Sequence, residues 1–311
     1  MEQPEVNDQV AISSATRTDE RAPASSLDRP APGILPALGC PTCGTAPATN
    51  SGTTVSPSYV YAIGRIEPRF PRPSAEKEFA QATGRAETSG LTDRQSTQKV
   101  LSQRSNRYLA RQLCWVMTVE GLETYILAPR DPADLDLLVE ALRPTPSPSD
   151  LDCVIGVRGP IAPPDLCNGL QVPVVVFDQI YSFERDSLIG AIPKPEGVNA
   201  EAFTATAGEV FDRIMQMADN AGATDEHRAL NYLAVRYPAI YSTATDCHNR
   251  SSSLTSVDVQ PSALSGTRTI VEVIFTFTNR NTDVDEQYFV RVDVTEEFPF
   301  LVTKMSPYYN R

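Results

Sequence analysis

Two cysteines, Cys40 and Cys43, form a Cys-Pro-Thr-Cys-Gly motif where a Pro/Ala/Ser-rich segment without an aromatic residue ends. Thiols at this spacing can bind one metal ion, because the turn between them directs both sulfurs to the same side. A tetrahedral zinc site needs two more ligands, and we predict that Cys114 and Cys167 supply them, since one begins a predicted strand and the other lies in a loop. A closed site of four cysteines would be structural rather than catalytic.

Three other residues are reserve ligands for this site, namely Cys153, Cys247 and His248. Two alternatives to a metal stay open for the Cys40 and Cys43 pair: ordinary reduced thiols, or a redox dithiol. The redox alternative is disfavoured because no thioredoxin-like βαβ pattern surrounds the motif. Disulfides are the minor alternative, since the acidic N-terminus lacks the basic-then-apolar order of a signal peptide. The same observation predicts a cytoplasmic protein.

Catalytic motifs are scarce in this sequence. It contains two histidines, His227 and His248, so schemes that need a histidine base have few candidates. The sequence has no Gly-x-Ser-x-Gly elbow, His-Glu-x-x-His helix, P-loop or Gly-x-Gly-x-x-Gly fingerprint. One enzymatic alternative remains, a metal- or thiol-dependent hydrolase or isomerase that acts on a peptide with Cys167 or Cys247 as nucleophile.

The charge of the chain is strongly acidic overall but uneven. A net charge of −12 argues against a general nucleic-acid binder or a protein that binds anionic membranes, because both partners are polyanions. Residues 65–111, however, contain ten Lys or Arg and only five Asp or Glu. This basic stretch either pairs with the acidic remainder of the chain or contacts an acidic peptide. On a helix predicted over 92–112, Arg104, Arg107 and Arg111 share one face and are the candidate peptide-binding residues.

The pattern of predicted helices and strands around these residues indicates an α+β domain over 39–311, preceded by a disordered tail over 1–38. Apolar, β-prone runs at 114–119 and 122–128 flank Glu120-Gly121 and indicate a hairpin. The segment 203–218 is an amphipathic helix, and the alternation over 270–294 predicts a C-terminal β-hairpin. We therefore expect a mixed or mostly antiparallel sheet with helices packed on it.

Two further strands are predicted at 153–157 and 172–177, the second apolar on both faces and therefore central in its sheet. Asp178 and Gln179 follow that strand. Polar residues beyond the end of a central strand are often placed in a binding crevice, and the alternative is a capped turn.

Four long strings in the sequence are unusual, namely YVYAIGRIEPRF (59–70), RYLARQLCW (107–115), VRGP (157–160) and DVTEEFPF (293–300). Together they resemble the C-terminal domain of cyanobactin maturation proteases of the PatG/PatA type. The resemblance runs from about Cys40 to the end of the chain. In that family the domain follows a subtilisin-like protease.

The resemblance does not transfer the protease activity, because the chain has neither an Asp-His-Gly nor a Gly-Thr-Ser-Met-Ala segment. It implies a role in making ribosomally synthesised, post-translationally modified peptides. We expect a non-catalytic accessory domain that binds a precursor peptide or a peptide-modifying enzyme of the pathway. The predicted hairpin over 270–294 further suggests an edge through which the domain forms a homodimer.

Overall fold

The computed structural model describes residues 57–86, 88–194, 199–217 and 219–309, which all belong to one compact unit, Thr54–Arg311. The predicted disordered tail over 1–38 lies outside these residues, as do Cys40 and Cys43. Within the described part of the chain, no helix is long and apolar enough to cross a membrane.

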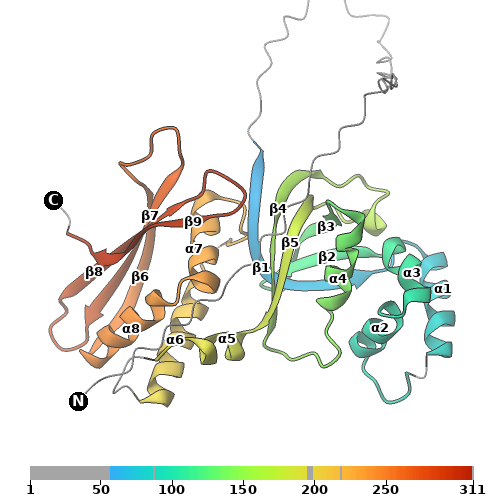
Figure 1. Cartoon of the computed structure of the whole chain (residues 1–311), viewed down its shortest axis with the longest axis horizontal. Coiled ribbons are helices and arrows are strands. Elements are labelled where there is room, and N and C mark those ends of the chain that lie inside the picture. Colours follow the sequence, from blue (N-terminus) through green and yellow to red (C-terminus); the bar gives the residue numbers. More distant parts are fainter. Residues whose placement is uncertain (1–56, 87, 195–198, 218, 310–311) are drawn as a thin grey trace, which may run out of the picture. The chain divides into compact units, whose positions relative to one another are not determined.

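The first half of the described chain folds into a closed five-stranded barrel (Figure 1). Its strands are β1 (Ser58–Arg69), β2 (Cys114–Val119), β3 (Leu122–Pro129), β4 (Asp150–Ile161) and β5 (Pro173–Glu184). Around the barrel the order is β1-β2-β3-β5-β4, and every neighbouring pair is antiparallel except β3 and β5. This order and these directions resemble those of an OB-fold barrel.

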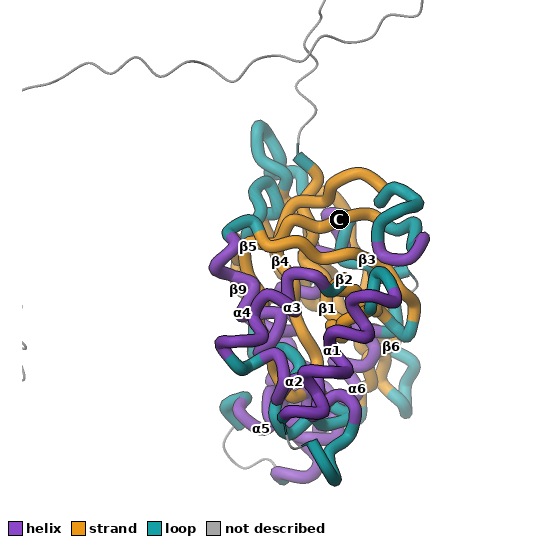
Figure 2. The backbone as a smooth tube through the Cα atoms, turned by 90° about the vertical axis from the view of Figure 1, so that its right-hand side faces the viewer, coloured by secondary structure: helices purple, strands orange, loops and turns teal. Residues whose placement is uncertain are grey.

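Short helices lie in two of the barrel's connections. The connection between β1 and β2 contains α1 (Pro73–Arg85), α2 (Asp93–Leu101), the 3-10 turn η1 (Arg104–Asn106) and α3 (Arg107–Gln112). The connection between β3 and β4 contains η2 (Pro132–Asp134) and α4 (Leu135–Glu140). Figure 2 shows α1 to α4 gathered on one side of the barrel strands. Their apolar side chains join the barrel interior in one buried cluster.

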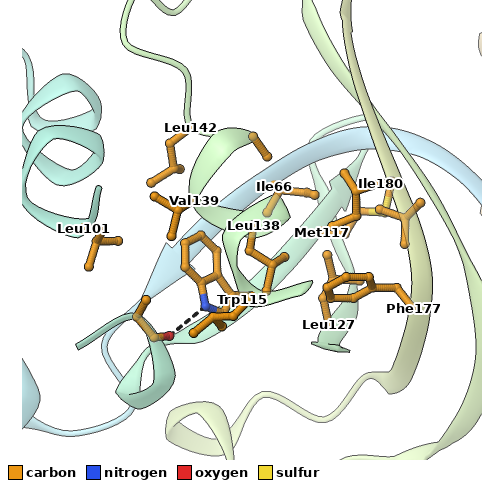
Figure 3. Packing of buried hydrophobic residues seen from close by; sticks show 14 of the residues in the cluster. Ile66, Leu101, Trp115, Met117, Leu127, Leu138, Val139, Leu142, Phe177 and Ile180 are labelled. Atoms are coloured by element: carbon orange, nitrogen blue, oxygen red, sulfur yellow. Dashed lines mark hydrogen bonds between the residues drawn. The ribbon is translucent and has the colours of Figure 1, made fainter. Parts of the chain in front are cut away.

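Trp115 lies where the barrel interior meets these helices, next to Leu138 and Val139 of α4 (Figure 3). Its indole Nε1 donates a hydrogen bond of 3.0 Å to the carbonyl of Ala110 in α3. The buried indole therefore has its polar atom satisfied, as a core tryptophan requires.

The single helix expected over 92–112 is wrong, because α2 ends at Leu101 and Gln103 is extended. Side chains explain the break. The Asn106 amide donates 3.0 Å to the carbonyl of Val100, and the Ser102 hydroxyl donates 3.1 Å to that of Lys99. Side-chain bonds of this kind offer the last carbonyls of a helix a partner other than the next turn.

The second half of the described chain is a helical layer on an antiparallel sheet. The helices are α5 (Arg185–Ala191), α6 (Ala200–Met215), α7 (Asp225–Arg236) and α8 (Ala239–Asn249). The sheet has the order β6 (Ser252–Pro261), β7 (Ile270–Asn279), β8 (Asp285–Asp293) and β9 (Phe300–Pro307). One face of the sheet packs against α6, α7 and α8 in a second large apolar cluster, and α6 and α7 lie between the sheet and the barrel (Figure 1).

The α+β class, the mostly antiparallel pairing and the C-terminal hairpin are all confirmed. The expectation that the hairpin over 270–294 offers a sheet edge is wrong. Its strands β7 and β8 are the two central strands, and β6 and β9 form the edges. Both hairpin strands therefore already have a neighbour on each side. The homodimer stays a prediction, but the hairpin does not supply its interface.

Helix α7 joins the two halves at β1. The buried Asn231 amide donates 2.8 Å to the carbonyl of Tyr61, and the Tyr61 N–H donates 2.9 Å to the carbonyl of Gly222. Gly222 has a φ of +71°, and a Cβ there would lie 2.3 Å from the Tyr61 carbonyl oxygen. Such a close approach needs glycine, so this contact fixes β1 against the start of α7.

Candidate functional site

A groove of about 730 Å³ runs between the barrel and α6. Its floor is apolar and comes from both halves, from Ile63 and Leu151 of the barrel and from Phe211 and Met215 of α6. Its remaining lining includes three arginines and four carboxylates, which are Arg65, Arg69, Arg185, Glu67, Glu120, Glu123 and Asp212. An apolar floor with a few polar groups is typical of ligand-binding clefts of this size.

Two neighbouring hollows extend this groove at its ends. A hollow of about 640 Å³ along α6, with Thr204 and Gly208 in its lining, shares Arg185, Asp212 and Gln216 with the groove. A hollow of about 450 Å³ beside the loop between β4 and β5 shares Arg69 and Glu123 with it. We call the three together the trough. It runs from α6 across the barrel to that loop, a shape that suits an extended chain.

Each junction of the trough carries an ion pair. Arg185 binds Asp212 through two contacts, Nε to Oδ1 at 2.9 Å and Nη2 to Oδ2 at 2.6 Å. Arg69 Nη2 lies 2.5 Å from Glu123 Oε1. The Asp212 and Arg69 side chains are about half exposed, so water screens both pairs and their net contribution to stability is small. Such pairs can exchange their partners for charged groups of a ligand.

A second polar cluster lies where the barrel meets the loop between β8 and β9. Asp178 of β5 and Arg130 form an ion pair of 2.6 Å, and Glu297 of the loop lies 3.7 Å from the same arginine nitrogen. The pKa of Glu297 is raised to about 7, mainly by burial and secondly by the neighbouring Asp178 carboxyl. The positive charges of Arg130 and Arg228 lower it in part. Glu297 therefore changes its charge close to neutral pH, well above the ordinary range of a glutamate.

Arg228 of α7 holds the loop that carries Glu297. Its buried guanidinium donates 2.7 Å to the carbonyl of Val294, and further hydrogen bonds to those of Glu296 and Glu297. The same guanidinium lies over the Tyr59 ring at 5.2 Å. Two of the strings that carried the resemblance, 59–70 and 293–300, therefore meet at one arginine.

The structure divides the three arginines predicted to bind a peptide between two helical segments. Arg104 lies in η1, whereas Arg107 and Arg111 lie one turn apart in α3. Arg107 pairs with Asp136 of the neighbouring α4. Arg104 and Arg107 line a hollow of about 250 Å³ together with Asp136 and Glu140, and Arg111 is not part of that lining. Their role in peptide binding stays a prediction.

Two of the four predicted zinc ligands meet in the structure. Cys114 and Cys167 are joined by a disulfide, with their Cα atoms 5.5 Å apart. In this form neither sulfur is a thiolate, so neither can bind zinc. The disulfide, which the sequence made the minor alternative, is therefore the form that the structure has for this pair. Among the described residues, no group of three or more His, Cys, Asp or Glu is arranged to hold a metal ion.

The remaining described cysteines lie apart from one another. Cys153 is buried on the outer face of the barrel against α7, and Cys247 is buried in the cluster of the second half. Burial raises the pKa of Cys153 to about 12 and also raises the pKa of Cys247, so both are thiols at neutral pH. His248 Nδ1 lies 2.9 Å from the Arg280 guanidinium, a cation that disfavours a metal there. These environments oppose the reserve metal set and a Cys247 nucleophile.

Sequence reasoning found only part of these sites. The basic stretch contains Arg65 and Arg69, but the sequence does not single out Asp212 of α6 or Gln216 just after it, because both are ordinary polar positions of a predicted amphipathic helix. Asp178 was singled out as the residue after a strand, yet it lies inside β5, which continues to Glu184. Glu297 lies in the string 293–300, and that string was the one available signal for it.

Comparisons with known proteins confirm the resemblance. Residues 197–308 match the family model described as PatG C-terminal. A solved structure titled "PatG Domain of Unknown Function" is similar with a TM-score of 0.67 and 20% sequence identity, covering 81% of this chain and 98% of that one. At this identity the likeness shows the fold. No curated protein matches the chain.

Proposed function

We propose that this chain is a non-catalytic accessory domain of a cyanobactin-type pathway, and that it binds an extended segment of the precursor peptide in the trough. The observation that carries the proposal is the trough itself, a groove with an apolar floor between the barrel and α6, flanked by two hollows that each share lining residues with it. The match of residues 197–308 to the PatG C-terminal family supports the pathway.

The chemistry of the trough favours a peptide over a compact ligand. A peptide presents apolar side chains for a floor such as Ile63 and Phe211, and polar main-chain groups for the arginines and carboxylates above it. Because the lining carries both charge signs, the affinity depends mainly on apolar contacts and hydrogen bonds. We therefore expect a weak dependence of the dissociation constant on salt concentration.

A bulky side chain at the first junction should block the trough without disturbing the core. Gln216 is exposed and lines both hollows that meet there, so the indole of Gln216→Trp should weaken peptide binding about tenfold, which is about 1.4 kcal/mol. The measurement is fluorescence anisotropy with a labelled synthetic cyanobactin-type precursor peptide. Gln81→Trp, at an exposed position on α1, is the matched control and should bind like the wild type.

Equal affinities for Gln216→Trp, Gln81→Trp and the wild type would contradict the trough as the binding site. If instead the joint charge reversal of Arg104, Arg107 and Arg111 to glutamate abolished binding, the peptide would contact the hollow between α2 and α4. In that case the binding site would be the hollow between α2 and α4, and the proposed accessory role would still hold.

A structural zinc is a second part of the proposal. Cys40 and Cys43 would hold it with Cys114 and Cys167, once the latter pair is reduced. Elemental analysis of the reduced protein should then find about one zinc per chain. The Cys40→Ser/Cys43→Ser variant should lose the metal and melt at a lower temperature, because metal binding contributes folding free energy. Reduced wild-type protein without metal would contradict the site.

A further inference from the structure

The loop between β4 and β5, residues 162–172, lies across the outside of the barrel, and we call it the strap. Its apolar residues Ala162, Leu170 and Val172 pack with Val116 of β2 and Ile126 of β3 in a small cluster of their own. The outer face of β2 and β3 is the face that OB-fold barrels leave open for ligands. In this chain the strap covers the part of that face around Val116 and Ile126.

Few interactions hold the strap in this place. Its ends are joined by a hydrogen bond of 2.9 Å from the Ala162 N–H to the carbonyl of Val172. Its middle residues, Pro163 to Leu166, are exposed to solvent. The covalent link is the disulfide between Cys167, in the short 3-10 turn η3 (Cys167–Gly169), and Cys114 at the start of β2.

The backbone beside this link is unfavourable for its sequence. Cys167, Asn168 and Gly169 follow one another with φ values of +51°, +57° and +86°. The left-handed region costs energy for residues other than glycine, so two of the three residues adopt a conformation that the surroundings must impose. The hydrogen bonds around Cys167 are local to the strap, from the Gly169 N–H to the carbonyl of Leu166 and from the Leu170 N–H to that of Cys167, so the disulfide is the link that ties this turn to β2.

We propose that the disulfide between Cys114 and Cys167 is a redox-controlled staple, which fixes the strap over β2 and β3 when oxidised and releases it when both cysteines are reduced and free of metal. Both cysteines are buried, but Cys167 lines the hollow at the end of the trough and Cys114 does not, so we place the attack of a reductant at Cys167. A thiolate of a dithiol reductant attacks Cys167 Sγ and forms a mixed disulfide with it. The Cys114 thiolate leaves and takes up a proton. The second thiol of the reductant then displaces Cys167. The protein gains two thiols, and the reductant becomes a disulfide.

Release of the strap would change two surfaces. It would uncover the apolar side chains of Val116 and Ile126. It would also remove one wall of the hollow that contains Arg69 and Glu123, because Asn168, Gly169 and Leu170 form that wall. The redox state would therefore control access to this end of the barrel, independently of whether the trough binds a peptide.

Hydrogen exchange followed by mass spectrometry tests this proposal. Two samples are compared, the oxidised protein and the protein reduced by a dithiol with a chelator present. The amides of Ala162, Gly169 and Leu170 should exchange at least tenfold faster in the reduced sample, while the exchange of α6 and β7 is the same in both. Cys114→Ser should show the fast exchange without reductant. Cys153→Ser/Cys247→Ser, which keeps the staple, should respond to reduction as the wild type does.

Three results would overturn the proposal. The first is equal protection of the strap in the oxidised and reduced proteins. The second is complete alkylation of Cys114 and Cys167 after treatment with a mild oxidant, which would mean that the disulfide does not form. The third is fast exchange of the strap in Cys153→Ser/Cys247→Ser before reduction, because the strap would then be open although the staple is in place. Peptide affinity is not measured, so failure here leaves the proposed function standing.

Discussion

Replacing Arg228 with methionine is expected to lower the free energy of unfolding by about 3–5 kcal/mol. The arginine side chain is 3% exposed, and burial lowers the pKa of its guanidinium. It compensates for this cost by donating to the carbonyls of Val294, Glu296 and Glu297. Methionine fills a similar volume but leaves those carbonyls without a donor, and an unsatisfied buried polar group costs about 1–3 kcal/mol.

Urea unfolding of the two proteins measures this loss. Arg236→Met is the matched control, since it is the same substitution on the same helix at an exposed position. Arg236 lies over the Tyr181 ring at 4.3 Å, a contact that contributes about 0.5–1 kcal/mol at an exposed site. If Arg228→Met destabilised the protein no more than Arg236→Met, Arg228 would not be what holds the loop between β8 and β9.

Replacing Glu297 with glutamine should remove a pH dependence of stability between about pH 4.5 and 7. The pKa of Glu297 is about 7 in the folded protein against an ordinary value of 4.5. Below pH 4.5 the Glu297 carboxyl is protonated in the folded and in the unfolded state, so its raised pKa does not change the free energy of unfolding. As the pH rises through 7, the unfolded chain releases the proton first, so the folded state loses stability. Glutamine keeps the neutral form at every pH.

The variant should therefore match the wild type near pH 4.5 and exceed its stability by about 2 kcal/mol at pH 8. Urea midpoints across this pH range give the comparison. Glu296→Gln, at the exposed neighbouring position, is the control and should retain the wild-type slope. Parallel pH profiles for the wild type and Glu297→Gln would show that the carboxyl pair with Asp178 does not hold a proton.

The sequence predicted local elements well because their signals are contiguous. Apolar runs around Glu120-Gly121 predict the hairpin formed by β2 and β3, and the amphipathic pattern over 203–218 predicts α6. Closure of the barrel was not predicted. It depends on pairs such as Tyr61 with Ile155 and Ile126 with Val174, whose partners are far apart in the chain.

The sites were harder to predict than the elements for the same reason. Cys114 and Cys167 were rightly taken together, yet neither sequence spacing nor composition distinguishes a shared metal from a disulfide. The trough needs α6 beside β1, and that arrangement depends on the contact of Asn231 and Gly222 with Tyr61. A pattern read along one segment cannot report which distant segment lies beside it.

Binding of a precursor peptide in the trough is the central claim, and photo-crosslinking tests it most directly. A synthetic cyanobactin-type precursor peptide carrying benzophenone would be irradiated with the full chain, and the adducts mapped by mass spectrometry. Adducts are expected between Thr204 and Gln216, on α6 and the residue that follows it, and on β1 between Ile63 and Arg69. Gln216→Trp should diminish them. Adducts confined to the α2 and α4 hollow, or no adducts above those with a scrambled peptide, would contradict the central claim.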